Sequence, residues 1–270
     1  TSDGPTDGML QSGTLDDVFM TANFGSRPEE DFAKLEEYQP DKPLVCMEYW
    51  NGWFDHWGVG HHTRDGADVA DVLDRMLKMG GSVNFYMFHG GTNFGFYNGA
   101  NRYEKYTPTV TSYDYDAPLS ECGDPTDKYY AVQEVLSKYV DVDKDLMPEP
   151  IAKKGYGKLE LSETACLFDN LDRLSDPVKT ACPEPMEKLG QDYGFILYST
   201  NISGPRKDNK LFIQDVHDRA LIFLDGEFKG IYMRDEPQDI TFDIPKEGVK
   251  LDILVENLGR VNYGPRFKDP

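Results

Sequence analysis

The stretch PLVCMEYW at residues 43–50 is apolar almost throughout and carries its only charge, Glu48, near its end. A continuous apolar run without alternation is typical of a strand buried on both faces of a parallel sheet. SVNFYMF at residues 82–88 shows the same pattern. Apolar residues recur at helical spacing between the two runs, and Gly80-Gly81 then provides a stop: Val69, Val72, Leu73, Met76 and Leu77. This order predicts a β-α-β unit with a helix over about residues 66–79.

A second amphipathic helix is expected at about residues 125–140, where Pro125 suits a first turn. At residues 141–155 Asp, Lys and Pro dominate, and no hydrophobic period survives. We therefore predict one domain at residues 1–140, a linker at 141–155 and a second domain at 156–270.

The second domain is predicted to be an all-β sandwich. Short β-patterned runs follow one another there without a long amphipathic helix, at residues 159–161, 195–199, 220–224, 228–233, 240–244 and 251–255. Asp225-Gly226 lies between two of these runs and is a strong hairpin signal. The predicted fold class is thus α/β plus all-β.

The composition excludes several classes of function. With 270 residues, 39% of them hydrophobic and 13% aromatic, the chain can bury a core and is not expected to be disordered. A net charge of −20 repels nucleic acid and anionic membrane surfaces, and no apolar run approaches the ~20 residues that span a bilayer. The four cysteines are irregularly spaced, so we expect reduced thiols rather than a disulfide scaffold or zinc site. Reduced thiols favour a bacterial cytoplasm, although the compartment itself stays unknown.

Glu48 is the first candidate for a functional residue. It ends a predicted buried strand and is followed at once by YWNGWFDHW at residues 49–57, which contains three tryptophans. In barrels of parallel strands the chemistry lies at the carboxyl ends of the strands, and aromatic faces suit the apolar face of a sugar. Taken alone, however, the residues favour a structural explanation, in which Glu48 forms a salt bridge and the tryptophans belong to the core.

Longer motifs favour a functional role for Glu48 over the structural explanation. CMEYWNGWFDHWG at residues 46–58, SVNFYMFHGGTNFGFYNGAN at 82–101 and TSYDYDAPL at 111–119 closely resemble glycoside hydrolase family 35, the β-galactosidases. VHDRA at residues 216–220 and VENLGRVNYG at 255–264 are similar to the β-domains of that family. The resemblance implies a (β/α)8 TIM barrel followed by jelly-roll-like, galactose-binding-like β-sandwich domains. It also implies retaining hydrolysis of terminal non-reducing β-D-galactose, with β-galactoside oligosaccharides or glycoconjugates as substrates and without a metal or organic cofactor.

The resemblance also implies roles for five residues. Glu48 matches the nucleophile at the end of barrel strand seven. Trp53 matches an aromatic beside the sugar, and Tyr86 on strand eight matches a hydroxyl near the nucleophile. Tyr113 and Tyr115 match the tyrosines that close the galactose pocket. A carboxylate that attacks the anomeric carbon and phenols that orient sugar hydroxyls fit this chemistry.

A second carboxyl is needed for the retaining mechanism, and the sequence does not contain its motif. In the family this acid/base is a Glu directly after an Asn at the end of strand four, whereas Glu256 precedes Asn257 and lies in the β-domain. Residues 1–140 have room for about three of the eight strand-helix units of a barrel, with residues 1–4 resembling the end of strand six. We therefore expect strands six to eight of a β-galactosidase and an incomplete β-domain.

This expected truncation has three open explanations: an incomplete gene model, a processed chain that stays with its amino-terminal half, or a diverged remnant. The missing barrel half or a homo-oligomer is the expected protein partner. The competing hypothesis is a non-catalytic carbohydrate-binding or structural remnant of such an enzyme. The absent acid/base favours this hypothesis, and the retained nucleophile opposes it.

Other clusters favour ordinary structural roles. Neighbouring histidines such as His61 and His62 point to opposite faces of an extended strand, which opposes a metal site. Asp114 and Asp116 are expected to support the flanking tyrosines without being catalytic. The glycines of residues 90–101 are expected to let the backbone pass close to the sugar pocket.

Overall fold

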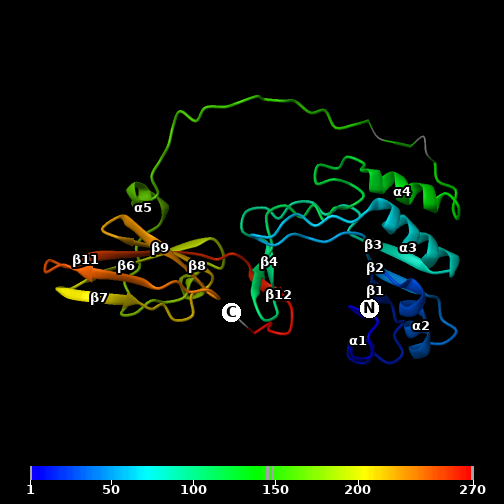
Figure 1. The fold of residues 1–270 in the computed structure, drawn as a ribbon, viewed down its shortest axis with the longest axis horizontal. Helices are drawn as coiled ribbons and strands as arrows, with labels where there is room; N and C mark the ends of the chain where they lie inside the picture. The colour runs from blue at the N-terminus through cyan, green and yellow to red at the C-terminus, as the bar shows by residue number, and fades with distance from the viewer. Residues whose placement is uncertain (1, 144–145, 148, 269–270) are drawn as a thin grey trace. The chain divides into compact units, whose positions relative to one another are not determined.

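A computed structural model describes residues 2–143, 146–147 and 149–268 (Figure 1). It divides into two compact units. The first comprises residues 1–101 and 107–151, and the second comprises residues 102–106 and 152–270. The first unit is mixed α/β and the second is built mainly of strands, as the sequence predicts.

The first unit is built on a three-stranded parallel sheet in the order β1-β2-β3. The strands are β1 (Ala22–Phe24), β2 (Val45–Trp50) and β3 (Ser82–Tyr86). The helices are α1 (Asp7–Gly13), α2 (Pro28–Tyr38), α3 (Gly66–Lys78) and α4 (Asp127–Leu136), and two short strands, β4 (Gly99–Arg102) and β5 (Tyr106–Pro108), follow β3 in the chain. The predicted strand-helix-strand unit is thus present as β2, α3 and β3.

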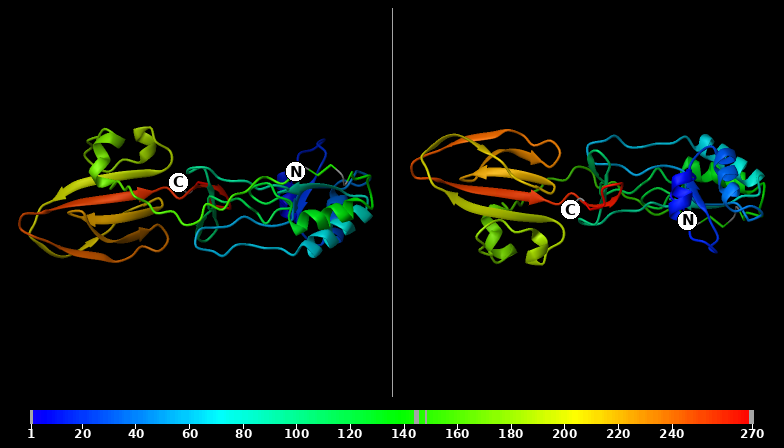
Figure 2. Two further views of the ribbon diagram at one scale, coloured as in Figure 1. Left: turned by 90° about the horizontal axis from the view of Figure 1, so that it is seen from above. Right: turned by 90° about the horizontal axis from the view of Figure 1, so that it is seen from below.

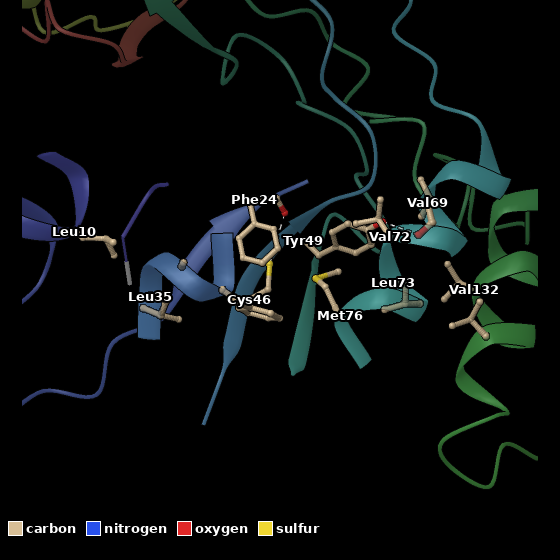
Figure 3. Packing of buried hydrophobic residues seen from close by; sticks show 13 residues of the cluster. Leu10, Phe24, Leu35, Cys46, Tyr49, Val69, Val72, Leu73, Met76 and Val132 are labelled. Carbon is tan, nitrogen blue, oxygen red and sulfur yellow. Dashed lines mark hydrogen bonds between the residues drawn. The ribbon is translucent and has the colours of Figure 1, made fainter. Parts of the chain in front are cut away.

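Helix α3 shows why this unit forms. The Asp65 side chain caps its first turn by accepting a hydrogen bond from the backbone N–H of Ala67, 2.7 Å away, and Arg75 and Lys78 complement the dipole in its last turn. Its apolar face is fully or almost fully buried and belongs to a single core with the strands and the neighbouring helices (Figure 3): Val69, Val72, Leu73 and Met76, with Phe24, Leu35, Cys46, Tyr49 and Val132. This core fixes β2 between its neighbours and so places Glu48.

Strand β1 is absent from the sequence-based prediction. It pairs in parallel with β2, and Ser2 in turn forms a parallel bridge to Ala22. Residues 1–4 were predicted as the end of the strand directly preceding β2, but β1 lies between Ser2 and β2. A buried strand of three residues is too short to show a hydrophobic period, so its position became clear only from its pairing.

The second unit contains a four-stranded antiparallel sheet in the order β6-β11-β8-β9 and a two-stranded sheet of β10 and β7. The strands are β6 (Phe195–Ile202), β7 (Arg206–Leu211), β8 (Arg219–Leu224), β9 (Glu227–Met233), β10 (Ile240–Ile244), β11 (Val249–Glu256) and β12 (Arg260–Tyr263). Three short helices precede them: η1 (Phe168–Asn170), α5 (Leu171–Leu174) and η2 (Met186–Leu189). The yellow to red strands of the larger sheet lie side by side in both views of Figure 2.

Two local predictions for this unit have opposite outcomes. The hairpin at Asp225-Gly226 is confirmed, since both residues have positive φ, at 48° and 81°, and join β8 to β9 as in a type I′ turn. The strand predicted at residues 159–161 is wrong, because Leu159 and Leu161 are 76% and 91% exposed and belong to no strand. A three-residue apolar pattern does not make a strand without a neighbour to pair with.

Two further features follow from the described residues. Among the residues that the structure describes, no helix is long and apolar enough to cross a membrane. All four cysteines are free thiols, with Cys46 buried and the other three exposed.

Candidate active site

Glu48 lies at a β-bulge near the end of β2. Cys46 pairs with Val83 and Tyr49 with Phe85, so β2 has one residue more than β3 over this interval. The register with β1 shifts at the same place. Bulges re-aim side chains and are common beside active sites. The carboxylate of Glu48 accepts a hydrogen bond on Oε2 from the indole N–H of Trp50, 3.1 Å away.

An aromatic cluster gathers the other four predicted site residues. Tyr113 and Tyr115 stack with their ring centroids 5.8 Å apart, and Tyr86 meets Tyr115 edge-on at 5.6 Å. The hydroxyl oxygens of Tyr86 and Tyr113 are 3.2 Å apart, at hydrogen-bond distance. Trp53 lies 6.2 Å from Tyr115. The structure therefore brings together aromatic residues that are up to 62 positions apart in the sequence.

Phe54 is a member of this cluster that sequence reasoning missed. Its ring stacks on Trp53 at 5.0 Å and on Tyr113 at 5.5 Å, so it joins the loop after β2 to the later tyrosines. The sequence presented it only as one more aromatic residue in an aromatic stretch. No local signal separated it from its neighbours.

The tyrosines keep their protons in this environment. Burial raises the pKa of Tyr113, and its hydrogen bond with Tyr86 and the charge of Glu48 raise it further. Burial also raises the pKa of Tyr115, with added contributions from Tyr86 and Glu48. The charge of Glu48 acts on both phenols, so the carboxylate lies within electrostatic range of the cluster. Neutral phenols can donate hydrogen bonds to a carboxylate or to a ligand.

Tyr115 has a feature that points to a ligand. Its side chain is 1% exposed, and within the described part of the chain its buried hydroxyl has no hydrogen-bond partner. Buried polar groups are nearly always paired in native proteins, and an unpaired one costs about 1–3 kcal/mol. A bound hydroxyl group would remove this cost.

Two glycines let the tyrosine loop lie directly on the ends of β2 and β3. A Cβ atom at Gly52 would lie 1.8 Å from the carbonyl oxygen of Tyr115, and one at Gly90 would lie 1.7 Å from that of Tyr113. Both contacts are far too short for any other residue. The predicted close approach at the start of residues 90–101 is therefore made to the tyrosine loop itself.

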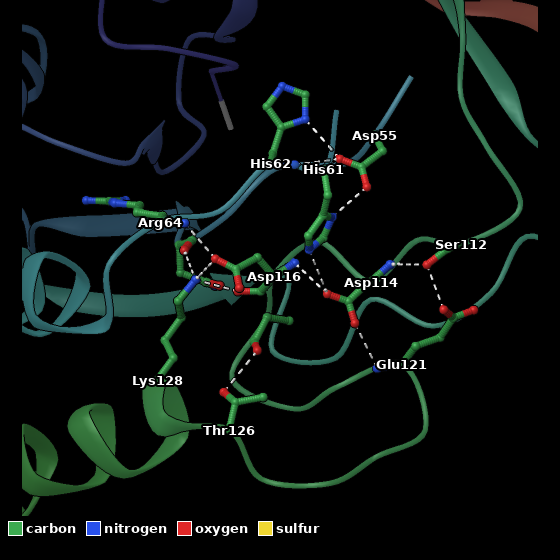
Figure 4. Close-up of polar contacts among 12 residues, drawn as sticks. Asp55, His61, His62, Arg64, Ser112, Asp114, Asp116, Glu121, Thr126 and Lys128 are labelled. Carbon is green, nitrogen blue, oxygen red and sulfur yellow. Dashed lines mark hydrogen bonds and ion pairs between the residues drawn. The ribbon is translucent and has the colours of Figure 1, made fainter. Parts of the chain in front are cut away.

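Carboxylates within the same loop hold its shape (Figure 4). Asp114 accepts hydrogen bonds from the backbone N–H groups of Asp116 and Glu121, at 3.0 and 3.1 Å. Glu121 in turn accepts from the hydroxyl of Ser112 at 2.6 Å and from Thr92. Asp114 thus supports the loop that carries the tyrosines through the backbone that follows Tyr115.

A second polar group joins Asp55 to the two neighbouring histidines (Figure 4). Asp55 lies 2.7 Å from Nδ1 of His61 and 3.0 Å from Nδ1 of His62, and it accepts the His62 backbone N–H at 2.9 Å. The hydrogen bond to Asp55 raises the pKa of His61 above its usual value. Burial alone would raise the pKa of Asp55, but its bonds to the histidines lower it below its usual value. Among the described residues, no group of His, Cys, Asp and Glu has the geometry of a metal site.

This pair of shifts predicts a pH window for the loop at residues 55–64. The stabilisation from His61 is fully present below its ordinary pKa of 6.5 and is lost as pH rises through the raised folded value. The stabilisation from Asp55 is present above its ordinary pKa of 3.8 and is lost as pH falls through the lowered pKa of the folded state. We expect His61→Gln to lower the melting temperature more at about pH 5.5 than at about pH 8.5. An equal loss at both values would contradict the charged pair.

Comparison with known proteins shows which families and relatives the chain resembles. Residues 1–139 match the model of "Glycosyl hydrolases family 35", and residues 183–270 match that of "Beta-galactosidase, first all-beta domain". Over its whole length the chain is 42% identical to a beta-galactosidase of Xanthomonas manihotis, 41% to the beta-galactosidase-1-like protein of Mus musculus and 40% to a beta-galactosidase of Homo sapiens. It spans 45%, 42% and 40% of the lengths of these relatives, respectively.

Proposed function

The chain belongs to glycoside hydrolase family 35, and from this membership we propose that it carries the nucleophile side of a β-galactosidase active site. The reaction is the retaining hydrolysis of terminal β-D-galactose residues, and Glu48 is the nucleophile. The observation that carries the proposal is the position of Glu48, at a bulged strand end and within electrostatic range of a cluster of buried and half-buried phenols.

In the proposed reaction, a carboxylate oxygen of Glu48 attacks the anomeric carbon as the bond to the leaving oxygen breaks. A covalent galactosyl-enzyme forms, and water later releases galactose with its configuration retained. The Trp50 N–H holds Oε2 of Glu48, which favours attack by the other oxygen. The phenols of Tyr86, Tyr113 and Tyr115 donate to sugar hydroxyls or to the nucleophile, and Trp53 offers its face to the ring.

In this proposal β1, β2 and β3 are strands six, seven and eight of a (β/α)8 barrel, and Ser2 lies at the end of strand five. The parallel pairing and the intervening helices support this assignment. The β-strands of the second unit form the sandwich domain that follows the barrel.

The acid/base carboxyl, roughly 5 to 5.5 Å from the nucleophile in a retaining site, is proposed to come from outside residues 1–270. The carboxylates near the site are already engaged. Asp55 binds two histidines, Asp116 binds Lys128, and Asp114 and Glu121 bind donors of their own loop. The remaining part of the barrel, from the same polypeptide or another copy, is the proposed source.

The competing proposal, a non-catalytic module that binds galactosides, uses the same pocket. It explains the unpaired Tyr115 hydroxyl equally well, but it gives no role to a carboxylate among the phenols.

The two proposals differ in covalent chemistry. Incubation with dinitrophenyl 2-deoxy-2-fluoro-β-D-galactoside separates them, because this leaving group departs without an acid catalyst and the fluorine slows release of the sugar from the enzyme. Galactose bound without a covalent label on Glu48 would favour the module.

Tyr115→Phe is expected to slow turnover by about fivefold to tenfold, because it removes one hydrogen bond of about 1 kcal/mol or somewhat more near a charge. The folded state should not lose stability, since the hydroxyl has no partner among the described residues. Steady-state kinetics on a chromogenic β-galactoside measure this effect in the chain extended upstream to the length of its relatives, with a change at the half-exposed Tyr130, Tyr130→Phe, as control. Unchanged kinetics in Tyr115→Phe would remove this hydroxyl from the site.

A further inference from the structure

A buried lysine lies directly behind the candidate site. Lys128, in the first turn of α4, is only 5% exposed. Its Nζ donates hydrogen bonds to the backbone oxygen of Asn51 at 2.9 Å, to that of Asp116 at 2.5 Å and to the Asp116 carboxylate at 2.7 Å. Burial lowers the pKa of Lys128, and the neighbouring Asp116 acts in the opposite direction. Three acceptors match the three donors of an ammonium group, so this charge is fully paired despite its burial.

Asn51 extends these contacts to β3. It follows the last residue of β2, and its side chain is completely buried. Its Nδ2 donates to the backbone oxygen of Met87 at 2.8 Å, directly after Tyr86 at the end of β3. Lys128 and Asn51 together therefore connect the end of β2, the end of β3 and the loop that carries Tyr115.

Arg64 supports the same two segments from another side. Its guanidinium donates to the backbone oxygen of Trp50 at 2.5 Å, and its backbone N–H donates to the Asp116 carboxylate at 2.6 Å. The carbonyl of the last residue of β2 and the carbonyl directly after it are thus each bound by a cationic side chain. Asp116 is the acceptor that Lys128 and Arg64 share.

The loop needs such donors because of its backbone conformation. Tyr115 and Asp116 both have positive φ, at 65° and 51°, which is uncommon for residues other than glycine. Such strain persists only where the surrounding structure holds it. An apolar side chain at position 128 could fill the volume, but it would leave the carbonyls of Asn51 and Asp116 without a donor from this helix.

We propose that Lys128 is a positioning residue that sets the spacing between the Glu48 strand, the Tyr86 strand and the Tyr113–Tyr115 loop. This inference rests on the proposed function, since the three segments carry the residues assigned to the galactose site. Lys128 acts through the backbone of Asn51 and Asp116 and does not itself touch the sugar.

The test compares Lys128→Met with Val132→Ala. Both changes remove buried groups from α4, but Val132 packs in the hydrophobic core and its apolar side chain cannot donate to the carbonyls of Asn51 and Asp116. Hydrogen exchange, followed by mass spectrometry, reports on residues 111–121, and calorimetry reports on galactose binding. In Lys128→Met we expect amide exchange in residues 111–121 to rise about tenfold or more and galactose affinity to fall about tenfold. Val132→Ala should lower the melting temperature and leave both readouts unchanged.

Two further variants complete the design. Lys128→Arg keeps the charge and should restore part of the affinity. If Lys128→Met does not fold, Lys128→Gln replaces it, because its amide keeps two N–H donors but is shorter and uncharged, and the same rise in exchange is expected. The proposal is overturned if loop exchange and affinity in the Lys128 variants match those of Val132→Ala. If the wild-type chain fails to bind galactose, the proposed function fails, and the exchange data still decide whether Lys128 holds the loop.

Discussion

Glu48→Gln is expected to abolish hydrolysis of β-galactosides, with a loss of about 10⁵-fold or more, while galactose binding stays nearly unchanged. An amide has almost the shape of a carboxylate but no negative charge with which to attack the anomeric carbon. The Trp50 N–H can still donate to the amide oxygen, so the local geometry is preserved. The loss should therefore appear in kcat rather than in affinity.

Two measurements check this prediction. Hydrolysis of a chromogenic β-galactoside is followed for the 270-residue chain and for the chain extended upstream to the length of its relatives. Mass spectrometry after incubation with dinitrophenyl 2-deoxy-2-fluoro-β-D-galactoside then locates a covalent sugar. We expect the label on the peptide that contains Glu48 and none in Glu48→Gln. Glu37→Gln, an exposed residue of α2 that pairs with Lys34, is the matched control.

The outcomes of these two measurements distinguish the possible assignments of the acid/base and the nucleophile. Activity only in the extended chain would support an acid/base that lies outside these residues. Activity in the 270-residue chain, lost in Glu48→Gln, would mean that another carboxyl in this chain is the acid/base. A label on a peptide without Glu48, or full activity of Glu48→Gln, would disprove the nucleophile assignment.

Gly52→Ala is expected to be strongly damaging although it changes no charge and adds only one methyl group. The new Cβ would lie 1.8 Å from the Tyr115 backbone oxygen, and the next contact is also with backbone, so no flexible side chain can move away. The tyrosine loop must shift as a whole, which pulls Asp116 from Lys128 and displaces Tyr115 from the cluster. We expect a loss of about 3 kcal/mol or more in the free energy of unfolding and loss of galactose binding.

Chemical denaturation and calorimetry measure these two effects. Gly60→Ala is the control, because a Cβ there meets nothing within 4 Å and its φ lies outside the left-handed region. It should leave the stability within about 0.5 kcal/mol of wild type. If Gly52→Ala behaves like Gly60→Ala, the close approach of the loop to the end of β2 is wrong.

The sequence predicted elements where the signal was long and local. Strand β2, helix α3 and strand β3 each carry a continuous or periodic apolar pattern, and the hairpin at Asp225-Gly226 follows from the turn chemistry of two residues. The sequence-based predictions for β1 and for residues 159–161 failed for the same reason. In three residues the pattern is too short, and pairing with a neighbour decides whether a strand forms.

The residues of the candidate site also fall into those that the sequence indicated and those that it did not. The resemblance to a family singled out Glu48, Trp53, Tyr86, Tyr113 and Tyr115. The residues that hold them in place, including Phe54, Asn51 and Lys128, gave no signal. A lysine in an amphipathic helix is usually solvent-exposed, so nothing in the sequence indicated that Lys128 is buried against two backbone carbonyls.

The sequence by itself determined the α/β and all-β classes and indicated candidate residues for glycosidase chemistry, because periodicity, turn residues and motifs act over short stretches of chain. Only the tertiary structure decided that β1 lies beside β2, that Glu48 sits at a bulge and that the loop at 113–116 packs on Gly52. These are contacts between residues far apart in the chain. Their geometry depends on how the packed core aligns the strand ends, which no local pattern encodes.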